Sequence, residues 1–212
     1  MGATTTAPLS GRRAEAARND QRILDAARAV FTTDPGAPIS AVAAQAGVGI
    51  SALYRRYRSK DELLQRLSAD GLRRYIAAVE AALADDGDPW SAFASFMRRS
   101  LDAGTSSLTV RFAGAFPVTD ELRQLGREAF ESTELLLARA QAAGAVRADI
   151  TGSDLSLLFE QLQALHVGDE RRTQQLRHRA LALLLDALHA TAAEPLPGPP
   201  PSWDELGRRY ER

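Results

Sequence analysis

The chain has 212 residues, of which 45% are hydrophobic and 25% charged, and its formal net charge is −1. This composition indicates a globular protein of one large or two small domains, and the absence of cysteine excludes disulfides, thiol catalysis and cysteine-ligated metals. Because the three histidines lack zinc-site spacing, and no signal-peptide core or run of about 18 apolar residues occurs, we expect a cytoplasmic protein without metal, cofactor or membrane segment.

Charge is distributed unevenly along the chain. Residues 1–60 carry nine Lys and Arg against four Asp and Glu, whereas residues 61–212 carry 17 against 23. A basic N-terminal part on an acidic body suggests that the N-terminal part meets a polyanion. A chance fluctuation of charge would give the same imbalance, so the motifs must decide between the two interpretations.

The N-terminal region begins with a segment rich in threonine, proline and glycine, and we predict a disordered basic arm over residues 1–17. The following stretch, "NDQRILDAARAVF", repeats apolar residues at intervals of three and four. This spacing predicts a helix. The turn-forming stretch "DPGAP", residues 34–38, is expected to end it.

Two short helices and one long helix are expected next. Ser40 is predicted to cap the first short helix, and Gly47 to end it in the left-handed conformation. The expected inner face of this helix holds Ile39, Val42, Ala43 and Ala46. The second short helix is predicted over residues 51–57. The stretch "SKDE", starting at Ser59, has the pattern of a capping box and predicts a long helix to about residue 84.

The rest of the chain keeps a helical period and has no convincing strand alternation or internal repeat, so we predict an all-α fold. The expected helices cover about residues 90–102, 106–115, 119–143, 153–166 and 170–192. The stretch "EPLPGPPPSW", residues 194–203, predicts an extended, polyproline-like tail. A second capping box at Ser202 predicts a short terminal helix.

The stretch "AGVGISALYRRY", residues 46–57, contains a match to the dinucleotide-binding pattern G-x-G-x-x-[G/A]. That pattern requires a strand before the glycines and a substantial helix after them. Here the preceding residues have helical spacing and the following helix is short, so we reject a nucleotide site. Two short helices joined by a glycine turn instead form a helix-turn-helix.

A helix-turn-helix places the N-terminal residues of its second helix against base edges in the major groove of DNA. Leu53 and Tyr57 are expected to face inward. The remaining side chains suit DNA: a serine or tyrosine hydroxyl for phosphate, an alanine methyl for thymine, and arginine for guanine or phosphate. The single lysine is placed for an anion at the start of the next helix. The predicted DNA-binding residues are Ser40, Ser51, Ala52, Tyr54, Arg55, Arg56 and Lys60.

The segment from Arg22 to Leu64 resembles the DNA-binding domain of TetR-family transcriptional regulators. The resemblance rests on the helix lengths, the glycine turn, the Leu-Tyr pair and the Ser-Lys pair. It implies an all-α homodimer with an N-terminal helix-turn-helix domain and a C-terminal domain for ligand binding and dimerisation. It also implies a repressor that a small, largely apolar effector releases from a pseudo-palindromic DNA operator. Ala52, Tyr57 and Arg58 depart from the residues usual in the family.

The predicted organisation has a helix-turn-helix domain at 18–64, a regulatory and dimerisation domain at 65–193 and a proline-rich tail at 194–212. The resemblance implies an effector cavity, for which the candidate residues are Phe93, Met97, Phe112 and Phe116. It also implies a four-helix dimer interface built from late leucine-rich helices. The candidates there are Leu155, Leu158, Leu162, Leu181, Leu184 and Leu188.

The favoured function is therefore a sequence-specific, DNA-binding transcriptional regulator without enzymatic activity. Two alternatives remain open. One is a helical interaction or scaffold protein that uses the leucine-rich helices. The other is an α-helical enzyme, for which the sequence offers no catalytic triad, metal cluster or supported phosphate loop.

Overall fold

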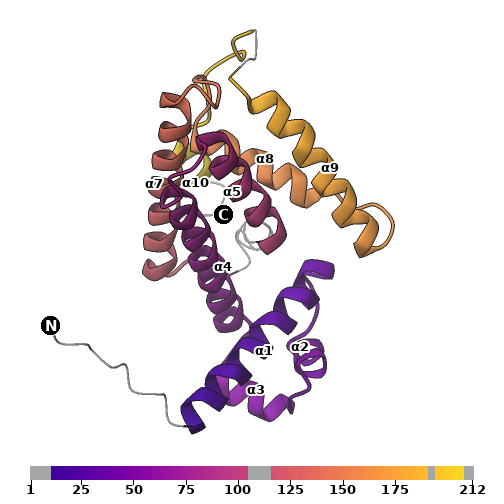
Figure 1. Ribbon diagram of the computed structural model, residues 1–212. Coiled ribbons are helices and arrows are strands. Elements are labelled where there is room, and N and C mark those ends of the chain that lie inside the picture. The colour runs from indigo at the N-terminus through magenta and orange to yellow at the C-terminus, as the bar shows by residue number, and fades with distance from the viewer. Residues whose placement is uncertain (1–10, 105–115, 191–193, 208–212) are drawn as a thin grey trace, which may run out of the picture. The chain divides into compact units, whose positions relative to one another are not determined.

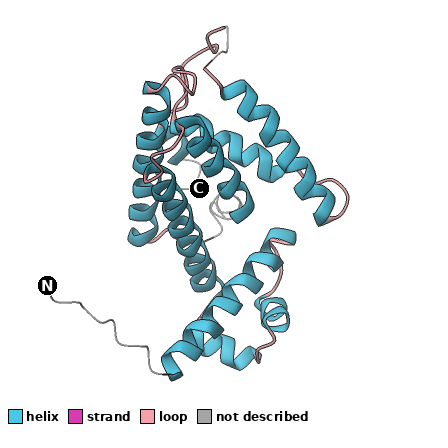
Figure 2. Ribbon diagram, viewed as in Figure 1, coloured by secondary structure: helices cyan, strands magenta, loops and turns pink. Residues whose placement is uncertain are grey.

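The computed structural model describes residues 11–104, 116–190 and 194–207, and the chain divides into two compact units between Leu63 and Leu64. All regular secondary structure in the described residues is helical (Figure 1, Figure 2), which confirms the predicted all-α fold class. The only β-type backbone pairing in these ranges is one isolated antiparallel bridge between Val146 and His189. None of the described helices is long and apolar enough to cross a membrane.

The first unit holds three helices and the first turn of a fourth: α1 (Gly11–Thr33), α2 (Ile39–Ala46), α3 (Ile50–Arg56) and α4 (Lys60–Leu83). Because α1 already begins at Gly11, residues 11–17 are helical, and the prediction of a disordered arm is wrong for them. The first ten residues of that arm lie outside the described residues. The other helix boundaries fall within two residues of the predicted ones.

The core of the first unit is formed by the inner faces of its helices. The predicted inner face of α2 is confirmed, since Ile39, Val42, Ala43 and Ala46 are all buried. Leu53 of α3 is fully buried, and Tyr57 just after α3 is almost so. They pack with the apolar face of α1, whose most buried members are Ile23, Leu24, Ala27 and Phe31.

The second unit contains the remainder of α4, followed by α5 (Pro89–Ala103), α7 (Asp120–Ala142), α8 (Gly152–Ala164), α9 (Glu170–Leu188) and α10 (Trp203–Gly207). The predicted helix over 106–115 lies outside the described residues. Aromatic and aliphatic side chains from α4, α5, α7, α8 and α9 share one core. Within it, Phe96 contacts Tyr75 and Phe159 edge-on, at ring distances of 5.4 and 6.3 Å.

The two predicted capping boxes have different outcomes. At Ser202 both halves form: the Ser202 N–H donates to the Glu205 carboxylate at 2.7 Å, and the Glu205 N–H donates to Ser202 Oγ at 3.2 Å. At Ser59 only one half forms: Ser59 Oγ accepts from the Glu62 N–H at 3.1 Å. The Glu62 carboxylate accepts instead from the Arg58 N–H, one residue earlier, at 2.7 Å.

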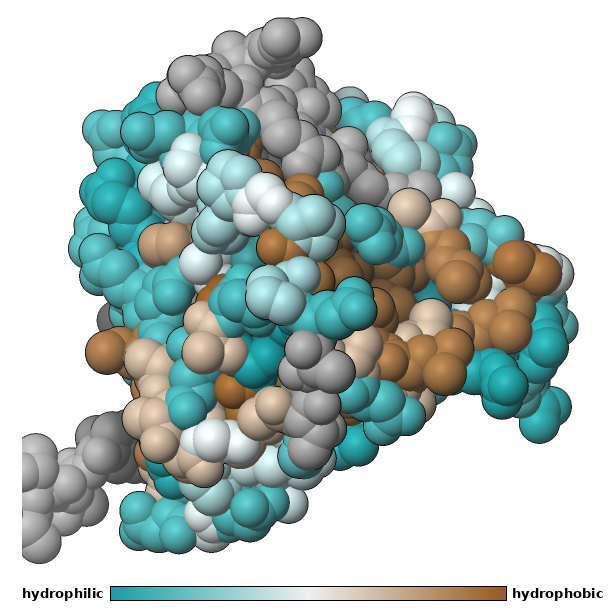
Figure 3. Space-filling model, turned by 90° about the horizontal axis from the view of Figure 1, so that it is seen from above, coloured by the Kyte–Doolittle hydropathy of each residue, from teal (hydrophilic) through white to brown (hydrophobic). Residues whose placement is uncertain are grey.

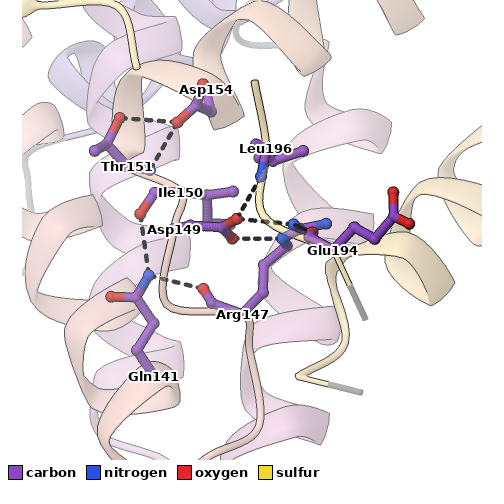
Figure 4. Close-up of polar contacts among 8 residues, drawn as sticks. All are labelled: Gln141, Arg147, Asp149, Ile150, Thr151, Asp154, Glu194 and Leu196. Carbon is purple, nitrogen blue, oxygen red and sulfur yellow. Dashed lines mark hydrogen bonds and ion pairs between the residues drawn. The ribbon is translucent and has the colours of Figure 1, made fainter. Parts of the chain in front are cut away.

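The C-terminal tail is tied to the turn between α7 and α8 by polar contacts (Figure 4). Arg147 and Asp149 form a two-bonded ion pair, with N···O distances of 2.6 and 2.8 Å. Arg147 also donates to the Glu194 carbonyl, and Asp149 accepts from the Leu196 N–H, both at 2.9 Å. These contacts hold the pKa of the Asp149 carboxyl below its usual value, mainly through Arg147 and then through the Leu196 N–H. The Asp149 contribution to stability is therefore present above the ordinary aspartate pKa and is lost as the pH falls below it.

Apolar contacts fix the end of the same tail. The Trp203 ring lies 4.6 Å from the Phe130 ring of α7, and Leu206 is buried. We expect Trp203→Ala to lower the free energy of unfolding by about 1–2 kcal/mol, because it removes an aromatic pair and its buried area. Chemical denaturation with helical circular dichroism measures this change. Leu196→Ala is the control, because Leu196 and Trp203 are similarly exposed, at 43% and 39%, but a leucine forms no aromatic pair with Phe130. Equal stability of the Trp203 variant and the parent would contradict a docked tail.

Candidate nucleic-acid interface

The turn between α2 and α3 is held by glycine geometry and by α1. Gly47 has φ 66°, the left-handed conformation that was predicted for it. The N–H groups of Gly47 and Val48 donate to the carbonyls of Ala44 and Ala43 at 3.2 and 3.0 Å, which ends α2. Arg22 of α1 donates to the Ala46 carbonyl at 2.8 Å. The angle at which α3 leaves α2 is therefore fixed by both backbone and side-chain bonds.

The outer face of α3 carries most of the predicted DNA-binding residues. Ser51, Tyr54 and Arg55 are exposed, whereas Ala52 is half-buried. Arg55 makes no hydrogen bond or ion pair with any other described residue, so its guanidinium is available to a ligand. A hydroxyl, a phenol and a guanidinium on one exposed helical face are suited to phosphates and to base edges.

Arg56 is in a different environment from Arg55. Its Nε and Nη2 donate to the two carboxylate oxygens of Asp20 on α1, both at 2.8 Å. The Tyr57 hydroxyl donates to the same carboxylate at 2.5 Å. The hydrogen bond to Asp20 is the main cause that raises the pKa of the Arg56 guanidinium, while burial and then Asp20 raise the pKa of Tyr57. Arg56 therefore fastens the C-terminal end of α3 to α1.

Lys60 also makes contacts within the first unit. Its ammonium donates to the carbonyls of Pro35 and Ala37 at 3.2 and 2.8 Å, and it lies 5.0 Å from the centre of the Phe31 ring. An ammonium has three donors, so these two bonds leave one donor for another acceptor. Lys60 thus closes the loop between α1 and α2 against the start of α4, a role that the sequence did not predict.

Ser40 does not cap α2, contrary to the prediction. The N-cap residue is Pro38, and no side chain bonds to the first turn. Ser40 is the second residue of α2, and it is exposed. Its predicted contact with DNA stays a prediction, since an exposed hydroxyl near a helix start has the chemistry for it.

Two residues of the interface were missed by the sequence interpretation. Asp20 is buried, and it binds side chains that lie 36 and 37 residues further along the chain. No local pattern marks such a pairing. Ile50 opens α3 and is exposed. It was missed because the third helix was expected to start one residue later.

The predicted effector residues occupy different environments. Phe93 and Met97 of α5 have no exposed surface and belong to the core of the second unit. Phe116 is half-buried, and Phe112 lies outside the described residues. In the chain as it stands, Phe93 and Met97 are packed as ordinary core side chains. Within the described ranges no group of three or more histidine, aspartate or glutamate side chains is placed to hold a metal ion.

Most of the leucines proposed for the dimer interface are buried within the chain itself. Leu155, Leu162, Leu181 and Leu188 are between 0% and 5% exposed and join the core of the second unit. Leu158 and Leu184 are partly buried against the same core. The four buried leucines pack within the chain itself, and their assignment to a dimer interface stays a prediction. The helical pattern predicted a buried face correctly but did not say which partner covers it.

Two family models match the chain, one in each region described above. The model of bacterial regulatory proteins of the tetR family matches residues 23–67, which include α2 and α3. The model of the SbtR-like transcriptional regulator C-terminal domain matches residues 88–190, from α5 to α9. Together they cover more than half of the chain. The tail with Trp203 lies beyond both matches.

Individual relatives agree with this result. The chain is 32% identical over 105 residues to the HTH-type transcriptional repressor LfrR of Mycolicibacterium smegmatis, a match that covers 50% of this chain and 56% of the relative. The aligned part thus spans about half the length of this curated relative.

Solved structures of TetR-type regulators resemble the chain over most of their length. Those from Streptomyces coelicolor and Mycobacterium vanbaalenii are 26% and 28% identical, each with a TM-score of 0.59. They match over 82% and 84% of this chain and over 99% and 98% of their own. LfrR from Mycobacterium smegmatis, solved with proflavine, shares the fold at 24% identity and a TM-score of 0.65, over 85% of this chain and 99% of its own. The chain belongs to the TetR family of bacterial transcriptional regulators.

Proposed function

We propose that the chain binds operator DNA through the outer face of α3 and represses transcription until a small effector releases it. The observation that carries the DNA-binding part is the exposed face of Ser51, Tyr54 and Arg55 on the second helix of the helix-turn-helix. We assign base reading to Arg55 and a structural role to Arg56, because Asp20 already binds the Nε–Nη2 edge of the Arg56 guanidinium. Lys60 retains one donor for a phosphate.

A mobility-shift titration tests this function against the two alternatives. DNA upstream of the gene and sequences selected from a random pool are the ligands. A regulator binds a subset of them selectively and loses affinity as the salt concentration rises. A scaffold protein or an enzyme shows no sequence preference. Equal affinity for selected and scrambled DNA would contradict the proposal.

The dimer that the proposal requires is assigned to the outer faces of α8 and α9. Along α9, four side chains that are exposed or half-buried recur at intervals of three and four: Leu176, Ala180, Leu183 and Ala187. Leu157 and Leu158 of α8 are half-buried as well. Hydrophobic residues gather on the right of the space-filling view, which is the side of α8 and α9 in the ribbon diagram (Figure 1, Figure 3). An apolar stripe of this spacing suits packing against the same stripe of a second copy.

Leu183 supplies the test of this interface. We expect Leu183→Glu to convert the dimer into a monomer, because it places a charge in the centre of an apolar stripe. Leu135→Glu on α7 is the matched control, since both leucines are 64% exposed. Light scattering coupled to size-exclusion chromatography reports the mass of each variant. The assignment fails if the Leu183 variant stays dimeric or if the Leu135 variant dissociates.

The effector is proposed to be a small, largely apolar molecule that binds the second unit. Such a ligand weakens operator binding if it favours a conformation whose two recognition helices no longer match the DNA spacing. The helix α4 runs without interruption from Lys60 in the first unit to Leu83 in the second, so it links the two. Proflavine, the ligand in the LfrR structure, is a suitable first probe within a wider panel. Unchanged operator affinity with every bound compound would contradict release by an effector.

A further inference from the structure

Two large apolar side chains are exposed on α3, Ile50 and Tyr54. Their exposed fractions are 40% and 48%, and they lie four residues apart on one side of the helix. No other large hydrophobic side chain in the described residues of the first unit is exposed. Tyr54 has a hydroxyl that suits a phosphate, but the side chain of Ile50 has no polar atom. Ile50 therefore needs an apolar partner if it contacts DNA.

Ile50 stands at the end of α3 that approaches bases in a helix-turn-helix. It is the first residue of the helix, directly after the N-cap Gly49, and N-terminal residues of a recognition helix are those that meet base edges. Gly49 contributes no side chain, and a methyl group at that position would meet no atom within 4 Å apart from those of its chain neighbours Val48 and Ile50. The space beside Ile50 is thus open to a ligand.

The chemistry of the major groove leaves one partner for such a side chain. Base edges there present hydrogen-bond donors and acceptors, and their one apolar group is the C5 methyl of thymine. An isoleucine over a donor or acceptor would remove it from water without replacing its hydrogen bond. We propose that Ile50 reads a thymine methyl in each half-site of the operator. This assignment rests on the proposed DNA-binding function, and it adds a specificity residue to it.

Ile50 is a better candidate for this contact than Ala52, to which the sequence assigned a thymine. Ala52 is half-buried between the exposed residues of α3, and its side chain is a single methyl group. Ile50 is exposed and has a longer side chain, so it reaches further from the helix axis. If Ile50 contacts the thymine methyl, Ile50→Ala loses sensitivity to that methyl group. If Ala52 makes the contact instead, Ile50→Ala keeps the sensitivity, so the two assignments can be distinguished.

Uracil substitution tests the contact directly, because uracil is thymine without the methyl group. Operator DNA is first selected from a random pool with the full chain, and each thymine of a half-site is then replaced by uracil in turn. We expect replacement of the contacted thymine in one half-site to weaken binding about fourfold, the effect of one apolar carbon removed from a contact. Symmetric replacement in both half-sites is expected to weaken it by about fifteenfold.

Variants identify the residue that senses the methyl group. With Ile50→Ala, the thymine and uracil duplexes are expected to bind equally, whereas Ile50→Val keeps part of the difference. Ser51→Ala is the matched control and keeps all of it. The Ile50 variants should keep the parent's thermal unfolding temperature and salt dependence of binding, since Ile50 is exposed and its side chain has no group that pairs with a phosphate.

Distinct outcomes overturn the inference and the proposed function. If selected DNA lacks a preferred thymine, if uracil has no effect, or if Ile50→Ala keeps the full effect, then Ile50 does not read a methyl group. In those cases selective binding still stands. If no selective DNA is recovered from the pool, the proposed function itself fails.

Discussion

Replacing Arg55 with alanine is expected to weaken the binding of operator DNA by about 1–3 kcal/mol in each half-site. Arg55 is exposed on α3 and engages no other described side chain or carbonyl, so DNA can take up all of its donors. Because Arg55 has no such partner within the described residues, Arg55→Ala should unfold at the same temperature as the parent. Fluorescence anisotropy with labelled operator at several salt concentrations measures the affinity, and scanning calorimetry measures the stability.

Arg56→Ala is the matched control for this experiment, because it removes the same charge one residue away. Its guanidinium is paired with Asp20, so its loss should lower stability while the slope of log affinity against log salt stays the same. Because Arg55 is assigned to base reading, Arg55→Ala should relax specificity at one base pair. A smaller salt slope with unchanged specificity would show instead that Arg55 binds a phosphate. A loss of affinity confined to Arg56→Ala would contradict the assignment.

Asp20→Ala is expected to lower the free energy of unfolding by about 2–3 kcal/mol, mainly the cost of an unpaired buried donor. The substitution removes the acceptor of three hydrogen bonds, two from Arg56 and one from the Tyr57 hydroxyl. The tyrosine carries most of this cost, because it is 3% exposed and would be left with a buried, unpaired donor. The arginine contributes less, since its side chain is 54% exposed and water can replace the lost partner. Urea denaturation followed by circular dichroism measures the change.

Asp25→Ala controls for the loss of an aspartate from α1. Asp25 is exposed and pairs with Arg28 within the same helix at 3.0 Å, so its removal should cost no more than about 0.5 kcal/mol. Tyr57→Phe, which removes only the buried hydroxyl, should lie between the two aspartate variants. An Asp20 variant as stable as the Asp25 variant would show that the network does not hold α3.

Local sequence patterns predicted the helices well because the determinants of these elements lie close together in the chain. Gly47 ends α2 in the left-handed conformation, and Ser202 with Glu205 caps α10. The spacing of Val42, Ala46 and Leu53 correctly assigned the inner faces of the short helices. The start of α1 was placed too late, since the composition of residues 11–17 gave no periodic apolar face.

Contacts between distant residues were beyond these patterns. The sequence could not distinguish Arg55 from Arg56, because the difference depends on Asp20, which only the packing of α1 on α3 brings near. Likewise, leucine spacing in α8 and α9 predicted an apolar face, yet Leu155 and Leu181 face the chain's own core. Leu183 was overlooked for the opposite reason: it lies in the same run of leucines but on the exposed side.

The ratio of affinities for selected and scrambled operator DNA tests the account most directly. The full chain is titrated against both duplexes at one fixed salt concentration, alongside the Arg55→Ala variant. The account predicts that the parent prefers the selected duplex by about a thousandfold or more, and that Arg55→Ala loses much of this preference. Equal affinity of the parent for both duplexes, or an unchanged preference in the variant, would contradict the claim that the outer face of α3 reads DNA.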